Sequence, residues 1–507
     1  MINDLGLLTS RYCDECGRPL VLYDMYCDIC GRRASSRSSL SRLRETIRLG
    51  SDNGLRRERG IFDSTKIVGI LLGLGMFAIF CQIPSWLDPL LSGFVAQLGS
   101  SMESSHPWAP MLRAVITVSW WLFLLLFVIV NAYQVSWAGV GYRLREKPWQ
   151  KGNPEDEIYN PSVAILIPAY NEERHIARTL KSCIDQTYRD ITQIILVDDG
   201  STDRTGSVVR EYMSRDKRIL YIRKERNEGK PAALNTGFSA SDADLTFFMD
   251  GDSHLDPSAI ERLVPHFKDP QVGCAASLIS IHNNNSILAK CQEIEYFFTQ
   301  LVTRFCQSLE KTVLICPGAG TMVRTSVAKM TDHSPRTITE DADFTFEIHR
   351  GWRISQEPDA YGYTDAMTTR KSFLNQRVRW LYGVLQTISI HRWSASKLWV
   401  LWAWFGYFMS PLTFAILALI PLMTYVFGFG FLVFFIGYGI VAGLLAWAVH
   451  AAPILWHPKP SKKLAFLVPI YLVYQQYLNF IQLRCVLAKA LRRGVTVGYG
   501  PRQIHTV

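Results

Sequence analysis

The chain has 507 residues, which is enough for two or three domains. Its hydrophobic content of 48% and mean hydropathy of +0.07 are high, and the apolar residues are clustered, which indicates membrane segments. The formal net charge is +10, but arginines are dense between Arg32 and Lys66 and absent between Pro84 and Met111. This asymmetry is typical of a membrane protein and not of a basic groove, so we expect no nucleic-acid binding.

Two CxxCG knuckles lie near the N-terminus. Four thiolates at this spacing can close a tetrahedral Zn²⁺ site, so residues 1–35 are predicted to form a zinc ribbon with a structural Zn²⁺. Free or disulfide-linked cysteines are the alternative, and iron is a weaker one. We expect the ribbon to dock a protein partner, with nucleic-acid binding the weaker interpretation. The predicted ligands are Cys13, Cys16, Cys27 and Cys30.

Two membrane spans are predicted within residues 67–140. Residues 36–66 form a polar, arginine-rich linker suited to anionic lipid headgroups, and no cleavable signal peptide is expected. Residues 67–83 and 112–138 are apolar and long enough to cross a bilayer. Trp120, Trp121 and Trp137 are candidate interface anchors. Two crossings place the ribbon and the following domain in the cytosol of an integral membrane protein of the plasma or inner membrane.

Residues 150–395 show the alternation of an α/β domain. Apolar runs predict strands, and the segments between them predict helices. Strands that alternate with helices imply parallel βαβ units. The expected strands are near 163–168, 193–197, 219–223 and 245–250, and the expected helices are at 173–187, 203–214 and 229–239.

The strand at 245–250 ends in two carboxylates. Asp250 and Asp252 straddle Gly251, which lets the backbone turn close to a ligand. Paired carboxylates suit Mg²⁺ or Mn²⁺, with a diphosphate completing the coordination shell. In open α/β sheets, ligands bind at the carboxyl ends of strands, where this pair lies. A solvated turn would explain the same residues if the motif stood alone.

The motif does not stand alone, because it is one of an ordered set: Tyr170-Asn171-Glu172, Asp198-Asp199-Gly200-Ser201, Gly229-Lys230, Asp250-Gly251-Asp252, Thr339-Glu340-Asp341, and Gln376, Arg379 and Trp380. Over about residues 160–390 the chain resembles the membrane-embedded, processive family 2 glycosyltransferases that make cellulose, chitin, hyaluronan and poly-N-acetylglucosamine. Residues 339–380 are closest to the poly-N-acetylglucosamine type. The resemblance implies a GT-A domain inserted between transmembrane helices.

The resemblance also implies a role for each motif in transfer of sugar from a UDP-sugar to a growing glycan. On the donor side, Asp198 or Asp199 contacts uracil or ribose, Tyr170 stacks on the base beside Glu172, and Lys230 meets the diphosphate. Gln376 and Arg379 cap the pyrophosphate of the donor. Trp380 stacks on the acceptor sugar, and Gly318 of the loop 316–320 faces the acceptor. These positions are candidate substrate-binding residues.

Asp341 is the candidate general base, which implies inversion at the anomeric carbon. Burial beside Glu340 is expected to raise its pKa from the ordinary value of about 4. Other interpretations are open. The acids also suit the first turn of a helix capped by Thr339. The loop 316–320 also suits a turn before a strand at 321–324, and Arg379 and Trp380 also suit a membrane interface.

The C-terminal region, 396–490, is expected to be transmembrane and is followed by a tail, 491–507. An amphipathic helix at 288–309 and an interfacial helix that includes His391 precede it. Apolar segments lie at about 398–426, 428–450 and 464–485, with a cytosolic basic loop at 459–463. We favour five spans, although a fifth puts Lys489, Arg492 and Arg493 outside, against the positive-inside rule. A final helix that does not cross fully is the alternative.

Polar residues recur on one face of the last apolar segment. Tyr471, Gln475, Asn479 and Gln482 are spaced as neighbours along a helix. Polar groups inside a membrane are costly and usually face protein or water. We therefore predict that they border a path for the exported sugar chain, with hydrogen bonding between helices as the alternative.

The combined features predict a processive polysaccharide synthase that also exports its product. UDP-N-acetylglucosamine is the favoured donor from the resemblance, with UDP-glucose and UDP-glucuronate also open. A membrane enzyme that adds one or a few sugars to a lipid is the first alternative. A catalytically silent scaffold that recruits partners through its zinc ribbon is the second, although acids are intact at every motif.

Overall fold

The computed structural model describes residues 11–12, 19–20, 131, 133–145, 159–331, 333–391, 400, 418, 420–421, 424, 429–491, 496–499 and 503–506. The chain divides into two compact units, Met1–Ile67 and Val68–Val507. In the first unit, β1 (Arg11–Tyr12) pairs antiparallel with β2 (Pro19–Leu20). Cys13, Cys16, Cys27 and Cys30 lie outside the described residues, as do the linker 36–66 and the span 67–83, so these stay predictions.

An eight-stranded mixed sheet forms the centre of the second unit, in the order β5-β4-β3-β6-β9-β8-β10-β7. The first four strands in sequence are mutually parallel where they pair, as predicted. The remainder was not predicted: β9 is antiparallel to both of its neighbours, β8 and β10 are parallel, and β7 is antiparallel to β10. The bounds are β3 Val163–Ala169, β4 Ile191–Asp198, β5 Ile219–Arg223, β6 Leu245–Phe248, β7 His254–Leu255, β8 Val272–Ile281, β9 Thr321–Arg324 and β10 Arg353–Thr364.

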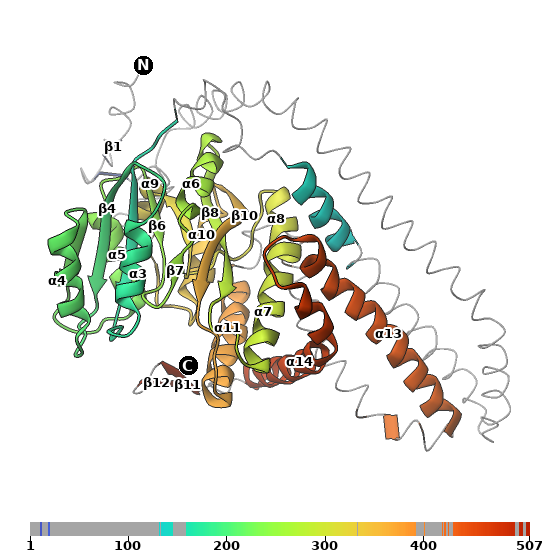
Figure 1. Ribbon diagram of the computed structural model, residues 1–507. Coiled ribbons are helices and arrows are strands. Elements are labelled where there is room, and N and C mark those ends of the chain that lie inside the picture. The colour runs from blue at the N-terminus through green and yellow to red at the C-terminus, as the bar shows by residue number, and fades with distance from the viewer. Residues whose placement is uncertain are drawn as a thin grey trace. The chain divides into compact units, whose positions relative to one another are not determined.

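Helices cover both faces of the sheet (Figure 1). Successive residues of β3 point to opposite faces, so Val163, Ile165 and Ile167 share a core with α3. Ala164 and Leu166 share another core with α5. Burial on both faces explains the continuous apolar run of β3. The three helices of this half lie where the sequence predicted them: α3 Ile176–Ile184, α4 Thr205–Arg215 and α5 Lys230–Ala240.

The second half of the domain carries the remaining helices. The amphipathic helix predicted at 288–309 is present as three consecutive segments, α7, η4 and α8, of which η4 is π-helical. The bounds are α6 Ala259–Leu263, η3 Val264–Lys268, α7 Ile287–Phe298, η4 Thr299–Arg304, α8 Phe305–Leu309, α9 Thr325–Met330, α10 Glu340–Ile348 and α11 Arg370–His391. The expected α/β domain therefore extends to α11.

A further hydrophobic core lies beside the sheet domain. It joins helical residues 133–144, α7 and α11 to two apolar helices, α13 (Phe429–Trp456) and α14 (Val468–Ala490). Trp137 is 1% exposed and stacks on Tyr133, so its predicted role as an interface anchor is wrong. Arg145 pairs with Glu357 at 2.6 Å and with Asp359 at 2.5 Å, which ties the end of this helix to the sheet domain.

Among the described residues, two segments are long and apolar enough to cross a membrane: Phe435–Trp456 within α13, and Lys462–Ala490, which joins η5 (Lys462–Leu467) to α14. The predicted span at 398–426 and most of that at 112–138 lie outside the described part of the chain. After α14, β11 (Thr496–Tyr499) pairs antiparallel with β12 (Gln503–Thr506). The basic loop at 459–463 lies on the sheet domain, because Lys459 Nζ is 2.9 Å from Asp256 Oδ2.

Candidate active site

The loops that follow β3 and β4 are tied together at the edge of the sheet. Asn171 donates its backbone N–H to Ser201 Oγ at 2.9 Å, and its side-chain oxygen accepts from Thr202 N at 2.8 Å. These contacts hold Asn171 at φ 58°, in the left-handed region that asparagine tolerates. Tyr170 is 44% exposed, and its stacking on a base stays a prediction.

Asp198 and Asp199 are buried, and their oxygens accept hydrogen bonds within the protein. Asp198 accepts from Ser201 N at 2.8 Å and from the Tyr221 hydroxyl at 2.6 Å. Asp199 accepts from Gly229 N at 2.7 Å and so fixes the turn that leads into α5. Both acids therefore fix the loops that follow β4 and precede α5, and direct contact with uracil or ribose stays a prediction.

Lys230, the first residue of α5, lies among carboxylates from two motifs. Its Nζ is 2.5 Å from Asp250 Oδ1 and 3.0 Å from Glu340 Oε1. Burial by itself lowers the pKa of Lys230, but the charges of Asp250, Glu340 and Asp341 outweigh it and raise that pKa. The same lysine lowers the pKa of Glu340 against the effect of burial. The structure thus brings together the GK, DxD and TED motifs around one ammonium group.

Asp341 lies beside this cluster and accepts two backbone hydrogen bonds. Its Oδ2 accepts from Gly318 N at 3.2 Å and its Oδ1 accepts from Ala342 N at 2.8 Å. Burial and the neighbouring charge of Glu340 raise the pKa of Asp341 to about 6. The predicted rise is confirmed in direction and cause. A carboxylate with this pKa is a better proton acceptor near neutral pH than an ordinary aspartate.

Asp252 and Glu172 add two more acids to the cleft. Burial raises the pKa of Asp252, and the charge of Asp250 contributes to the rise. Burial also raises the pKa of Glu172 to about 7, against a hydrogen bond from His175. The acids gathered here outnumber the one lysine that pairs with Asp250 and Glu340. This excess fits a divalent cation on Asp250 and Asp252, whose carboxylate oxygens are hard donors.

Within the described residues, no cluster of three or more His, Cys, Asp or Glu side chains is arranged to hold a metal ion. A cation on Asp250 and Asp252 would therefore take its remaining ligands from water or from a bound diphosphate. Gly251, between the two acids, approaches Glu172 and the backbone closely: a Cβ there would lie 3.1 Å from Glu172 Cγ and 3.2 Å from Pro168 O. The Thr179 hydroxyl, 2.8 Å from Gly251 O, fixes the turn.

The loop 316–320 places its backbone against the acids. Besides the bond from Gly318 N to Asp341, a Cβ added at Gly318 would lie 2.7 Å from Lys230 Nζ. The strand predicted after this loop is present as β9. The loop is therefore both a turn before a strand and one wall of the cleft.

Thr339 precedes the first residue of α10, as the capping interpretation requires. Its side chain makes no capping hydrogen bond, and its hydroxyl is buried without a partner. Glu340 and Asp341 instead face Lys230 and Gly318. A simple helix cap does not explain these side chains.

The QxxRW motif lies on α11, where an unpredicted residue organises it. Arg377 is 2% exposed, its Nη1 donates to Gln376 Oε1 at 3.1 Å, and its guanidinium lies 4.4 Å from the Trp380 ring centroid. Its Nη2 also pairs with Glu295 of α7 at 2.7 Å, and the Tyr474 hydroxyl of α14 donates to the same Glu295 oxygen at 2.5 Å. The residues in these contacts are far apart in the sequence, so no local sequence pattern could have predicted them.

Arg379 lies near the TED acids, because its charge helps to lower the pKa of Glu340. Asp343 Oδ1 of α10 lies 2.6 Å from His391 Nε2 of α11, so a buried hydrogen bond joins the TED helix to the motif helix. His391, predicted to lie on an interfacial helix, is buried here. Residues 392–399 lie outside the described part of the chain.

Arg304, in η4, is a second basic residue that sequence analysis missed. Its Nη1 donates to Gln300 Oε1 at 3.0 Å, and it forms no ion pair within the described residues. Burial lowers the pKa of its guanidinium, although Cys316 and Asp341 oppose this. Its position in a π-helical segment, typical of functional sites, could not be read from sequence.

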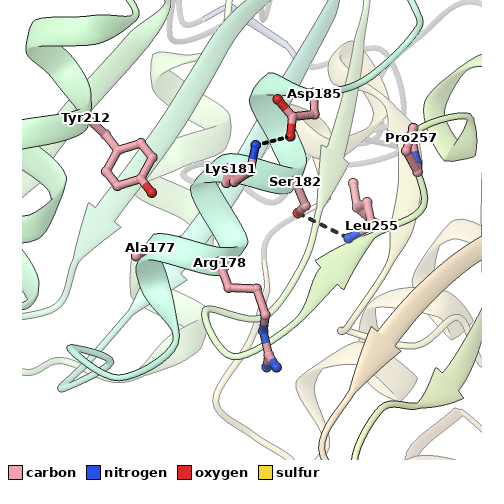
Figure 2. Close-up of a pocket in the computed structure, with 8 residues that line it drawn as sticks. All are labelled: Ala177, Arg178, Lys181, Ser182, Asp185, Tyr212, Leu255 and Pro257. Carbon is pink, nitrogen blue, oxygen red and sulfur yellow. Dashed lines mark hydrogen bonds and ion pairs between the residues drawn. The ribbon is translucent and has the colours of Figure 1, made fainter.

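A pocket of 380 Å³ lies beside α3, and none of the predicted site residues lines it (Figure 2). Two of its polar groups are already paired: Lys181 with Asp185 at 2.7 Å, and Ser182, which accepts from Leu255 N at 3.1 Å. Arg178 connects the cavity to the cleft, since its Nη2 donates to Asp252 O at 3.2 Å. The cavity is lined by Ala177, Arg178, Lys181, Ser182, Asp185, Tyr212, Leu255 and Pro257.

Comparison with known proteins identifies the domain. Residues 164–330 match the model of Glycosyl transferase family 2, so the chain contains a glycosyltransferase domain of that family. The match includes β3 to β6 and β9, with the strand ends that carry the cleft, and supports the expected GT-A class of fold.

Two curated relatives are also similar to this chain, and both are named for N-acetylglucosamine. The chain is 29% identical over 272 residues to an N-acetylglucosaminyltransferase of Rhizobium meliloti (strain 1021), covering 51% of this chain and 63% of that protein. It is 29% identical over 260 residues to a poly-beta-1,6-N-acetyl-D-glucosamine synthase of Staphylococcus aureus (strain COL), covering 51% and 61%. The chain thus spans less than two thirds of the relatives' length.

A solved structure, the mannosyltransferase PcManGT from Pyrobaculum calidifontis in complex with GDP-Man and Mn²⁺, is 17% identical, with a TM-score of 0.44 over 72% of this chain and 98% of that one. A resemblance of this size supports no argument about the site.

Proposed function

We propose, on the premise of a family 2 glycosyltransferase domain at residues 164–330, that the chain transfers sugar from a UDP-sugar to a growing β-linked polysaccharide, with inversion and with help from a divalent metal. One observation supports this most: Lys230 Nζ lies 2.5 Å from Asp250 and 3.0 Å from Glu340, beside Asp341. Donor-side and acceptor-side motifs thereby meet in one cleft, as a single displacement requires.

UDP-N-acetylglucosamine is the proposed donor. The two relatives described above are named for N-acetylglucosamine, and each is 29% identical to this chain. Because the chain covers 63% and 61% of them, the sugar is an inference from part of their length. UDP-glucose and UDP-glucuronate are the competing donors.

Asp341 would accept the proton of the attacking hydroxyl. Its pKa of about 6 keeps it ionised at neutral pH while leaving it basic enough to assist. Gly318 N and Ala342 N fix the orientation of its carboxylate. A hydroxyl that attacks from this side displaces a diphosphate on the opposite side of the sugar ring, which inverts the anomeric carbon.

Positive charge would stabilise the leaving diphosphate. Lys230 is placed to exchange Asp250 for a phosphate oxygen, and Arg379 lies close enough to affect Glu340. Asp250 and Asp252 would hold Mg²⁺ or Mn²⁺, which supplies further stabilisation of the charge on the leaving group. The excess of acids in the cleft fits this site.

The acceptor would bind along α11 toward the apolar helices. Trp380 presents a ring beside Tyr296, with centroids 6.1 Å apart, and aromatic faces suit sugar rings. Export through a path bordered by Tyr471, Gln475, Asn479 and Gln482 stays a prediction. In this structure Tyr471 is 2% exposed and its hydroxyl donates to Gln475 at 3.0 Å.

The test is to supply purified full-length protein with radiolabelled UDP-sugars and Mn²⁺ or Mg²⁺, and to size the product. Labelled polymer from UDP-N-acetylglucosamine, lost when EDTA is added, is expected. A small lipid-soluble product would support the single-addition alternative. No release of UDP from any donor would contradict the proposal and favour a scaffold.

A further inference from the structure

Helix α3 holds the turn that carries the two acids of the DxD motif. The buried Thr179 hydroxyl lies 2.8 Å from Gly251 O and 2.7 Å from Ser253 O. The neighbouring residue, Arg178, donates from Nη2 to Asp252 O at 3.2 Å. Two adjacent side chains of one helix therefore contact three consecutive carbonyls of the turn. Because these carbonyls are held, the backbone from which the Asp252 carboxylate projects is held as well.

The same nitrogen of Arg178 has a second partner, outside the turn. It lies 3.4 Å from Asp365 Oδ2, and Asp365 belongs to the loop between β10 and α11, the helix of the QxxRW motif. Figure 2 shows the guanidinium directed away from Lys181 and Asp185, which form the ion pair of the pocket beside α3. Arg178 is thus used to join the DxD turn to the loop that leads into α11.

The loop that contains Asp365 is itself fixed by two amide side chains. Ala366 N donates to Asn283 Oδ1 at 2.6 Å, and Asn283 Nδ2 donates back to Ala366 O at 3.2 Å. Gln292 of α7 makes the same two kinds of bond to Met367, at 3.1 and 2.9 Å. An amide that both donates to and accepts from one residue fixes the position and the orientation of that backbone. Asp365 is therefore a firm anchor for Arg178.

Another arginine of the domain shows what an ordinary structural pair looks like. The side chain of Arg218 is 33% exposed, as is that of Arg178, and it pairs with Asp216 at 2.6 Å and donates to Ile184 O at 3.5 Å. Neither partner of Arg218 is a candidate site residue. The partners of Arg178 are 74 and 187 residues away in sequence, and the nearer one is a candidate metal ligand. Arg178 therefore connects parts of the cleft that Arg218 does not touch.

We propose that Arg178 is a positioning residue for the divalent cation, because it holds the main chain of Asp252 to Asp365 and so fixes the DxD turn relative to α11. This inference rests on the proposed function, in which Asp250 and Asp252 hold the cation. The bond goes to the Asp252 carbonyl and not to its carboxylate, so Arg178 does not compete with the cation for carboxylate oxygens. A planar guanidinium with donors in a fixed geometry suits such a bridge.

Loss of this bridge should weaken cation binding without abolishing the cleft. The bonds from Thr179 to the turn remain, so the backbone keeps its course, but the Asp252 carboxylate is less firmly placed. Partners that orient metal ligands typically change metal affinity or activity by about 10–100-fold when they are removed. Because the nucleotide-side contacts of Asp199 and Asn171 are untouched, UDP affinity without metal should not change.

Manganese binding to full-length protein tests the proposal with a readout other than turnover. Electron paramagnetic resonance of free Mn²⁺, in the presence of UDP, gives the Kd for Mn²⁺. Arg178→Met and Asp365→Ala should each weaken Mn²⁺ binding about tenfold, and the double variant should be no weaker than the weaker single variant, because both changes break one bridge. Arg178→Lys, which keeps the charge, should bind Mn²⁺ with intermediate affinity.

Arg218→Met is the matched control, and it should leave the Kd for Mn²⁺ unchanged while shifting thermal unfolding about as much as Arg178→Met does. Should Arg178→Met fail to fold, Asp365→Ala carries the same test, because the Asp365 side chain is 28% exposed and its removal fills no space.

Three results would overturn the inference. Wild-type Mn²⁺ affinity in both Arg178→Met and Asp365→Ala, with UDP release still dependent on metal, would do so and leave the proposed function standing. Equal weakening in Arg218→Met would show that a general loss of stability is the cause. A wild-type protein that binds no Mn²⁺ with UDP would contradict the proposed metal site, and the inference would fail with it.

Discussion

The donor-side and acceptor-side halves of the cleft are assembled differently. On the donor side, partners are close in sequence: Asn171 with Ser201 and Asp199 with Gly229 are each 30 residues apart. On the acceptor side, Arg377 and Glu295 are 82 apart and Tyr474 and Glu295 are 179 apart. Strand-loop-helix units therefore build the donor side locally, whereas the acceptor side depends on tertiary contacts that reach the apolar helix α14.

The largest effect is expected from Asp341→Asn, which tests whether the two halves meet at one proton acceptor. Loss of a general base costs about 10²–10⁴-fold in rate. We expect turnover to fall in this range while UDP affinity, measured by calorimetry, stays within about twofold, because the donor side does not include Asp341. Asp269→Asn, at a partly exposed pair with Arg353, is the matched control and should leave both values unchanged.

Arg377→Met tests whether the acceptor side depends on its buried ion pair. The change leaves Glu295 without its cation, and breaking a buried pair costs about 3–5 kcal/mol. Thermal unfolding should shift accordingly, and KM for acceptor should rise more than kcat falls. Arg350→Met removes an exposed pair with Glu347 and should change stability by less than about 1 kcal/mol. Equal losses of stability in Arg377→Met and Arg350→Met would contradict a special contribution of the buried ion pair.

Gly383→Ala tests the contact between the motif helix and the TED helix. A Cβ at Gly383 would lie 2.5 Å from Thr339 Cγ2, so one helix must shift. Overpacking typically costs about 1–3 kcal/mol, and we expect a similar loss of stability together with slower turnover. Gly351→Ala is the control, because nothing lies within 4 Å of its added Cβ. Activity equal to the wild type would show that this packing does not position Asp341.

The pH dependence of turnover also tests whether Asp341 is the proton acceptor. Asp341 must be deprotonated to act, and its pKa is about 6. Turnover should therefore be nearly constant above pH 7 and fall about tenfold per pH unit well below pH 6. In Asp341→Asn this acidic limb should be lost. A wild-type limb near pH 4 would indicate an unperturbed carboxylate.

Much of the donor side could be predicted from sequence. Apolar runs predicted the strands β3, β4, β5 and β6. Because two of these strands end in acids, the sequence also predicted that Asp250 and Asp198 lie at one edge of the sheet. The positions follow from local rules, because a parallel strand delivers its carboxyl end to a known edge. The antiparallel β9 was expected as a strand, but its pairing was not, since register between distant strands leaves little local signal.

The acceptor side depends on contacts that local sequence patterns do not predict. Arg377 lies between Gln376 and Arg379 at a position for which the QxxRW motif specifies no residue, and only its burial against Glu295 and Tyr474 reveals its use. Trp137 looked like an interface anchor because its neighbours are apolar, but a packed helix core has the same composition.

The most direct measurement is a structure of the full chain with UDP and Mn²⁺. The account predicts Mn²⁺ on the carboxylates of Asp250 and Asp252, with the diphosphate as its other ligand and Lys230 moved from Asp250 to a phosphate oxygen. UDP bound elsewhere, for example in the cavity beside α3, or Mn²⁺ absent from both aspartates, would contradict it.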